Sequence, residues 1–172
     1  MPSSSDTVRS LFADGLRNAH ALENQALSIM KPQLSRIESY PELAEQLRRH
    51  VDETDRQIAR IDAVLDRMGE SSSSLKDTAM SFTGGMAALS HSMAGDEILK
   101  NTFANHAFEN FEIAAYTSLI SLASACGMED AARSLTESLE EEKRMAAWIL
   151  ENTPRITLKY AELSEAGAYA KV

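Results

Sequence analysis

Apolar residues recur every three or four positions along most of this 172-residue chain. That spacing places them on one side of an α-helix and predicts amphipathic helices packed around a shared core. β-branched residues are few, and only 7 glycines and 4 prolines interrupt the pattern, so the helices can be long. The pattern predicts five helices, over residues 7–36, 39–69, 96–126, 129–151 and 153–170.

Capping signals mark several of the predicted helix ends. Ser39 and Glu42 have the spacing of a capping box, in which two side chains reciprocally satisfy free amides at a helix start. Thr153 is followed by Pro154, the combination of an N-cap with a proline in the first helical position. A separate fifth helix is therefore expected to begin there. Pro32 predicts a kink or an early end in the last turns of the first helix.

Residues 70–95 break the helical pattern, because they contain a run of four serines and the pair Gly84-Gly85. This segment is too long for a tight hairpin and suits a crossover along the length of a bundle. We therefore expect one all-α domain of 172 residues, a ferritin-like four-helix bundle with one long crossover plus a C-terminal fifth helix. Residues 1–6 are expected to form a flexible N-terminus, with Asp6 capping the first helix.

Composition and charge narrow the range of partners. The formal net charge of −9 argues against binding to nucleic acid or to an anionic membrane. The single cysteine, Cys126, excludes an intramolecular disulfide and a cysteine-rich zinc site. The polar N-terminus does not resemble a signal peptide, and no apolar run has the length of a membrane span. A cytoplasmic location is therefore expected.

Carboxylates on the apolar stripes are the main candidates for chemistry, although a lone glutamate on a helix is usually a solvated surface group. Burying several carboxylates without compensation would cost several kcal/mol each, and two dications would neutralise most of that charge. Carboxylates with imidazole on facing helices are how di-iron and di-manganese bundles bind metal. The candidate ligands are Glu23, His50, Glu53, Glu109, Glu112 and Glu142. His50 could equally be a ligand, a hydrogen-bond donor to one, or an ordinary helix histidine.

Four short runs make the chain resemble the YciE/YciF-like family, bacterial stress-associated proteins of the ferritin-like superfamily. They are Leu-Glu-Asn-Gln at 22–25, His-Val-Asp-Glu-Thr at 50–54, Glu-Asn-Phe-Glu-Ile-Ala-Ala-Tyr at 109–116 and Leu-Glu-Glu-Glu-Lys at 139–143. The resemblance covers nearly the whole chain and implies a homodimer with a two-metal site in each bundle. The family's acidic positions match all five candidate glutamates, and its histidine on the second helix matches His50.

Three positions depart from the pattern expected of such proteins. Ferritin-like sites usually place a histidine three residues after a glutamate on two helices. Here that position holds Arg56 after Glu53 and Met145 after Glu142. Relatives also tend to carry an acidic residue where this chain has Ala146. These changes leave the occupancy of one metal position open.

Three classes of function follow from these residues. The first is a stress-response metal protein that binds two divalent ions, with iron favoured over manganese or zinc, and has at most a ferroxidase or peroxide-consuming activity. The second is a metal-free structural or protective dimer. The third, an enzyme acting on an organic substrate, ranks last because the sequence shows no additional segment that would build a substrate pocket. No catalytic residue and no organic substrate is predicted.

Overall fold

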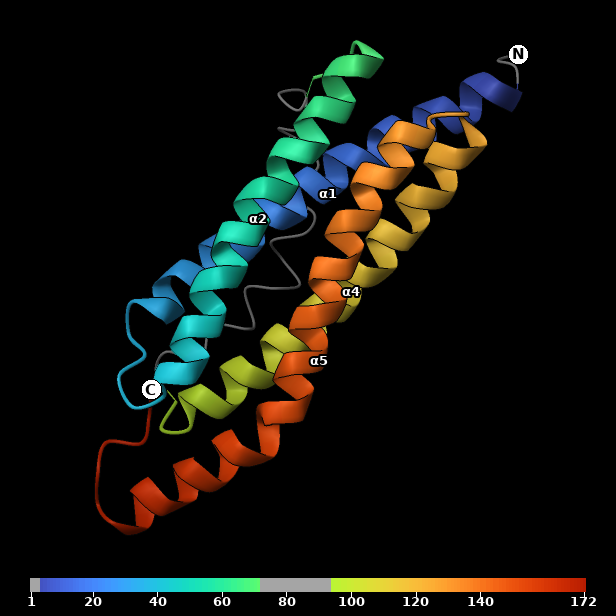
Figure 1. Cartoon of the computed structure of the whole chain (residues 1–172). Coiled ribbons are helices and arrows are strands. Elements are labelled where there is room, and N and C mark those ends of the chain that lie inside the picture. Colours follow the sequence, from blue (N-terminus) through green and yellow to red (C-terminus); the bar gives the residue numbers. More distant parts are fainter. Residues whose placement is uncertain (1–3, 72–93) are drawn as a thin grey trace.

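The computed structural model describes residues 4–71 and 94–172, and four long helices make up most of this part of the chain (Figure 1). Within these two ranges no strand is formed, so the predicted all-α class is confirmed. The helices are α1 (Ser4–Leu34), α2 (Pro41–Met68), α4 (Glu97–Ala125) and α5 (Glu129–Glu165).

The four helices form a bundle in which α1 and α5 each contact both α2 and α4. Short loops make α1 antiparallel to α2, and α4 antiparallel to α5 (Figure 1). α2 and α4 run in the same direction, so Met68 and Glu97 lie at opposite ends of the bundle (Figure 1). This order of directions is the ferritin-like topology with one long connection. The crossover predicted over 70–95 falls mainly on residues 72–93, outside the described part.

Two apolar clusters occupy successive lengths of the bundle. Leu16 and Ile61 belong to the first cluster, and Leu47 and Ile149 belong to the second. All four side chains are at most 1% exposed, and burying an aliphatic side chain of this size stabilises the fold by about 1.5–3 kcal/mol. A third, smaller cluster closes one end of the bundle with Tyr40, Leu43, Ile98 and Ile156.

The predicted break between a fourth and a fifth helix is wrong. α5 continues from Glu129 to Glu165 with Pro154 inside it, and the helix changes direction in its last third (Figure 1). Thr153 is not an N-cap, because its hydroxyl donates to the carbonyl of Ile149 at 2.7 Å. Proline removes one backbone hydrogen bond and bends a helix. Here Ile156, two residues after Pro154, is buried against the end of the bundle and holds the bent segment in place.

The predicted capping box at Ser39 is also wrong. The N-cap of α2 is Tyr40, and no side chain of the described residues caps it. The hydroxyl of Ser39 donates instead to the carbonyl of Tyr169 at 2.8 Å, and the hydroxyl of Tyr40 donates to the carbonyl of Ala170 at 2.7 Å. Contacts with the C-terminal segment, 130 residues away in sequence, therefore replace the local cap.

The N-terminal prediction needs a smaller correction. α1 begins at Ser4, so residues 4–6 are helical rather than flexible and Asp6 lies in the first turn. Residues 1–3 lie outside the described part. Pro32 lies inside the last turn, and α1 ends at Leu34, which agrees with an early end. None of the four helices is long and apolar enough to cross a lipid bilayer.

The core accounts for most of the stability of the bundle, and one matched pair of substitutions tests this. We expect Leu16→Ala to lower the free energy of unfolding by about 2–5 kcal/mol, because it leaves a cavity around a fully buried position. Leu158→Ala is the control, since Leu158 is 65% exposed and its loss should change stability by less than about 0.5 kcal/mol. Urea unfolding followed by circular dichroism measures both. Equal losses in the two variants would contradict the assignment of the core.

Candidate metal centre

A layer of polar side chains crosses the bundle between its two main apolar clusters. Along α5, Leu135 belongs to the first cluster, Glu142 to the polar layer and Ile149 to the second cluster. All four helices contribute to the layer, so the whole cross-section of the bundle is polar at this level. The members that are at most 2% exposed are Glu23 from α1, His50, Thr54 and Gln57 from α2, Glu109 and Glu112 from α4, and Ser138 and Glu142 from α5.

Helical spacing explains why these side chains face inward together. His50 and Gln57 are seven residues apart, and Glu109 and Glu112 are three apart, so each pair lies on one side of its helix. The same stripes carry the apolar residues of the two clusters on either side. The helices therefore bury the polar residues with the apolar ones.

His50 is at the centre of the layer. Its Nε2 lies 3.1 Å from Oε2 of Glu109 and 3.6 Å from Oε2 of Glu142. Its Nδ1 lies 3.2 Å from Oε2 of Glu53, on the same helix. One ligand atom from each of His50, Glu109 and Glu142 lies within 4.8 Å of the other two. Three helices thus place two carboxylates and an imidazole around one small volume.

Glu23 and Glu112 complete the buried cluster. The hydroxyl of Tyr116 donates to Oε1 of Glu23, while Oε2 of Glu23 and Oε1 of Glu112 have no hydrogen-bond partner among the described residues. Both carboxyls interact electrostatically with Glu109. They are therefore part of the same site as the group around His50.

Burial of so many acids changes their proton affinity. Burial raises the pKa of Glu23 to about 8, although the Tyr116 hydroxyl opposes the shift. Burial also raises the pKa of Glu112, and that of Glu142, well above the usual value, and neighbouring carboxylates add to both shifts. Burial disfavours a charge on His50, but Glu109, Glu53 and Glu142 together outweigh it and hold the pKa of this imidazole well above its usual value. The layer thus attracts positive charge, either as protons or as cations.

Glu53 differs from the other five predicted ligands. Its side chain is 21% exposed, and Arg144 lies 3.5 Å from its Oε1 on the outside of the bundle. The hydrogen bond from His50 lowers the pKa of Glu53, so this carboxylate is ionised over most of the pH range. The structure places Glu53 at the edge of the cluster, where it connects the buried imidazole to the surface.

Sequence reasoning missed a charged pair that adjoins the site. Arg60 donates two hydrogen bonds to Glu141, at 2.6 and 3.0 Å, and one to Ser138 at 3.2 Å. Gln57 donates to Glu141 at 3.1 Å and also to Glu142. Glu141 is the middle of three consecutive glutamates, and nothing in its local sequence shows that Arg60, on another helix, covers it. Arg60 follows Gln57 by three residues, which is the one signal that could have placed it beside the layer.

The donor set fits divalent cations. Oxygens of Glu23, Glu112 and Glu142 are buried and lack hydrogen-bond partners within the described ranges, and Oε2 of Glu109 has only the imidazole of His50 beside it. Buried oxygens of this kind are expensive to leave unpaired. Carboxylate oxygens with one imidazole suit iron, manganese or zinc. Met145, where a second histidine was expected, accepts a hydrogen bond from Gln46 at 3.5 Å. His50 is therefore the only imidazole that the described residues bring to the cluster.

Comparison with known proteins identifies the family. Residues 7–162 match the family described as Domain of unknown function (DUF892). The chain belongs to this family. It is 31% identical to Protein YciF of Escherichia coli K12 over 148 residues, which are 80% of this chain and 84% of YciF. The resemblance to YciE/YciF-like proteins is thereby confirmed.

Solved structures agree with the fold. A protein from Xanthomonas campestris pv. campestris is 30% identical, with a TM-score of 0.77 over 92% of this chain and 99% of its own. The Escherichia coli stress protein YciF superposes with a TM-score of 0.73 and 25% identity, over 90% of this chain and 99% of its own. YcfI of Rhodopseudomonas palustris, at 23% identity and a TM-score of 0.65 over 87% of this chain and 96% of its own, shares the fold alone.

The buried acids set the pH dependence of stability of the metal-free protein. The folded-state pKa is raised for Glu23, Glu112 and Glu142, and for His50. Each of these groups therefore binds its proton more tightly in the folded protein than in the unfolded chain. The stability gained in this way is fully present below the unfolded-state pKa, which is near 4.5 for the acids. It is lost as the pH rises through the folded-state pKa, which is about 8 for Glu23. We expect the free energy of unfolding in chelator to fall between pH 5.5 and 8, by up to about 1.4 kcal/mol per pH unit for each proton released.

Urea unfolding in the presence of a chelator at several pH values measures this slope. Glu23→Gln should flatten it, because the amide stays neutral while its oxygen can still accept from Tyr116. Glu151→Gln, at an exposed position, should leave the slope unchanged. Greater stability at pH 8 than at pH 5.5 in the metal-free protein would contradict the raised pKa values.

Proposed function

We propose that this chain is a ferritin-like protein of the bacterial stress-response type that binds two divalent metal ions, preferably iron. The observation that supports it most is the group of four buried carboxyls around one imidazole, in which Glu23, Glu112 and Glu142 each keep a buried oxygen without a hydrogen-bond partner among the described residues. Once ionised, four acids against one base would put a large negative charge in a low-dielectric interior, and two dications would compensate it. The homology to YciF, described as a stress protein, agrees with this class of function.

The residues divide between the two metal positions. His50, Glu109 and Glu142 would hold one ion, because their ligand atoms already lie within 4.8 Å of one another. Glu23 and Glu112 would hold the other, with Tyr116 fixing one oxygen of Glu23. Glu53 would join from the edge of the cluster by turning away from Arg144. The first position has a nitrogen donor and the second has only oxygens, so the two differ in chemistry.

Iron in such a site would supply electrons to O₂ or peroxide, in a ferroxidase or peroxide-consuming reaction. The chain's own contribution is to exclude water with the two apolar clusters and to keep the ligands in place. Gln57 holds Glu142 by a hydrogen bond, and Arg60 neutralises the adjacent Glu141. The protein would act in the cytoplasm, a reducing compartment that suits a chain with a single cysteine and no intramolecular disulfide.

The alternative is a metal-free structural or protective protein, and two hydrogen bonds favour it. Tyr116 donates to Glu23, and Gln57 donates to Glu142, so part of the layer is satisfied without metal. Protonation of the remaining acids would remove most of the charge. In this case the layer would be a polar component of the core, and the helices would serve only to associate with a partner.

Metal binding separates the two functions. We expect about two Fe(II), Mn(II) or Zn(II) ions per chain after anaerobic equilibrium dialysis and elemental analysis. Metal should also raise the melting temperature. This rise should be larger at pH 8 than at pH 6, because the ligands must lose protons to bind metal. The double substitution Glu109→Gln/Glu112→Gln should reduce binding at least tenfold, since it removes a ligand from each position. The matched pair Glu151→Gln/Glu162→Gln changes two exposed acids and should bind as the wild type does.

Each possible result favours one reading. If the wild type binds none of the three metals, the metal proposal fails and the metal-free alternative stands. If it binds metal but neither oxidises Fe(II) in air nor consumes O₂ or peroxide, binding stands and the redox reaction fails. The metal-free alternative predicts that Glu109→Gln/Glu112→Gln is neutral or stabilising with and without metal. A variant that is less stable than the wild type only when metal is present would contradict it.

We also propose that two copies of the chain associate, as its membership of the YciF-like family led us to expect. The side formed by α1 and α4 has an apolar hollow of about 220 Å³ lined by residues that include Leu22 and Leu122. Leu11, one turn before Gly15 at the rim of this hollow, is 54% exposed. Exposed apolar surface next to a hollow is typical of a protein interface.

A charged substitution tests this interface. Leu11→Glu should shift the protein from dimer to monomer in size-exclusion chromatography with light scattering, because it places a charge on the apolar surface. Leu158→Glu makes the same change at another exposed leucine and should leave the dimer intact. A wild-type monomer would refute association itself, and a dimer that withstands Leu11→Glu would place the interface elsewhere.

A further inference from the structure

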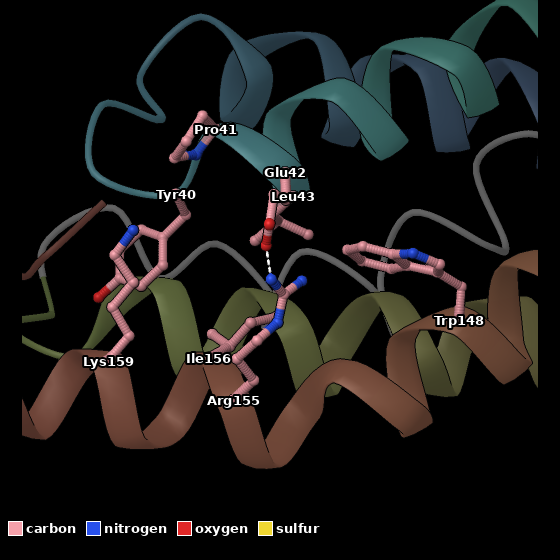
Figure 2. A pocket seen from close by; sticks show the side chains of 8 residues that line it. All are labelled: Tyr40, Pro41, Glu42, Leu43, Trp148, Arg155, Ile156 and Lys159. Carbon is pink, nitrogen blue, oxygen red and sulfur yellow. Dashed lines mark ion pairs between the residues drawn. The ribbon is translucent and has the colours of Figure 1, made fainter.

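A second hollow lies at the end of the bundle, between the start of α2 and the bent part of α5 (Figure 2). Its volume is about 230 Å³. Tyr40 and Leu43 line it from the α2 side, and Trp148, Ile156 and Lys159 line it from α5. None of the predicted metal ligands contributes to this hollow, so it is a separate feature of the fold.

The hollow is apolar and aromatic on its inner side. Leu43 and Ile156 are buried in the small cluster that closes this end of the bundle, and the partly buried Trp148 and the buried Tyr40 add aromatic rings. Figure 2 shows the indole of Trp148 extending into the space between the two helices. Walls of this kind bind flat, apolar groups, because aromatic rings stack on them or meet them edge to face.

The rim carries more positive than negative charge. Arg155 is paired with Glu42 across the hollow (Figure 2) and also donates to Asn152 at 2.8 Å. Lys159 lies with its Nζ 5.4 Å from the centre of the Tyr40 ring, and no carboxylate of the described residues lies within 4 Å of it. Two cations and one acid give a local charge of about +1 on a chain whose net charge is −9.

The start of α2 adds to this positive potential. α2 begins at Pro41, which lines the hollow, and no described side chain caps the helix start. The positive end of the helix dipole is therefore directed toward the rim. The effect supports Lys159 but is too weak to select a ligand by itself, since it is worth about 0.3–1 kcal/mol at an exposed site.

We propose that this hollow binds a small aromatic carboxylate. The ring would lie on Leu43 and Ile156, between the aromatic rings of Tyr40 and Trp148 (Figure 2), and the carboxylate would pair with Lys159 beside Tyr40. An engineered cavity of about 150 Å³ holds one benzene molecule, so a hollow of about 230 Å³ has room for one ring and its acid group. The site lies outside the metal-binding function, and its test does not depend on metal.

The chain provides its own reporter, because Trp148 is its only tryptophan. Titration of the full chain with benzoate, with excitation at the red edge of the indole band, should give a saturable change in fluorescence. Benzyl alcohol and benzylamine keep the ring but lack the negative charge, and acetate keeps the charge but lacks the ring. We expect each of these three to bind at least about fivefold more weakly than benzoate.

Substitutions identify the cation that recognises the acid. Lys159→Gln should weaken benzoate binding at least fivefold, and Lys159→Arg should retain it, because the charge is kept. Lys143→Gln, at an exposed lysine of the same helix that pairs with Glu140, should bind as the wild type does. Circular dichroism of each variant checks that α5 is intact.

Several results would overturn the proposal. One is the absence of a saturable benzoate signal, and another is equally tight binding of benzyl alcohol. A third is unchanged affinity in Lys159→Gln. Metal binding by the same preparations, measured separately, should be identical in wild type and Lys159→Gln, so failure of this site and failure of the metal centre can be told apart.

Discussion

The burial of four carboxyl groups around one imidazole is the constraint on which the rest of this structure depends. Glu23, Glu109, Glu112 and Glu142 are each at most 2% exposed, and an ionised carboxylate in such a place is very costly unless something compensates it. His50 lies close enough to compensate one charge. The remaining acids must be compensated by protons, hydrogen bonds or metal ions. Which of the three compensates them determines the charge of the site and how its stability depends on pH.

The bundle can carry this polar layer because apolar clusters lie on both sides of it. Leu16 and Leu135 anchor one side, and Leu47 and Ile149 anchor the other. The helices are long enough to extend well beyond the layer in both directions, so the apolar burial that stabilises the fold is kept apart from the groups that destabilise it. The apolar core and the buried acid cluster thus occupy different lengths of the same four helices.

Much of this arrangement could be predicted from the sequence, because it depends on periodicity. Helical spacing identified the four buried glutamates and His50 as members of the apolar stripes, and those positions are buried as expected. The errors concern contacts between segments distant in sequence. Ser39 looked like a cap, but its hydroxyl is taken by Tyr169. Thr153 looked like a cap before proline, but packing of the later turns at Ile156 keeps the helix continuous.

Three consecutive glutamates on α5 show why composition alone could not define the site. Glu140 is exposed and pairs with Lys143, Glu141 is covered by Arg60, and Glu142 faces His50 in the core. Successive residues of a helix are rotated by about 100°, so identical side chains meet solvent, a cation and a buried acid cluster in turn. Only Glu142 is left with a buried oxygen that no described residue satisfies. What surrounds each carboxylate, rather than its residue type, therefore decides whether it is a surface charge, part of an ion pair or a member of the buried acid cluster.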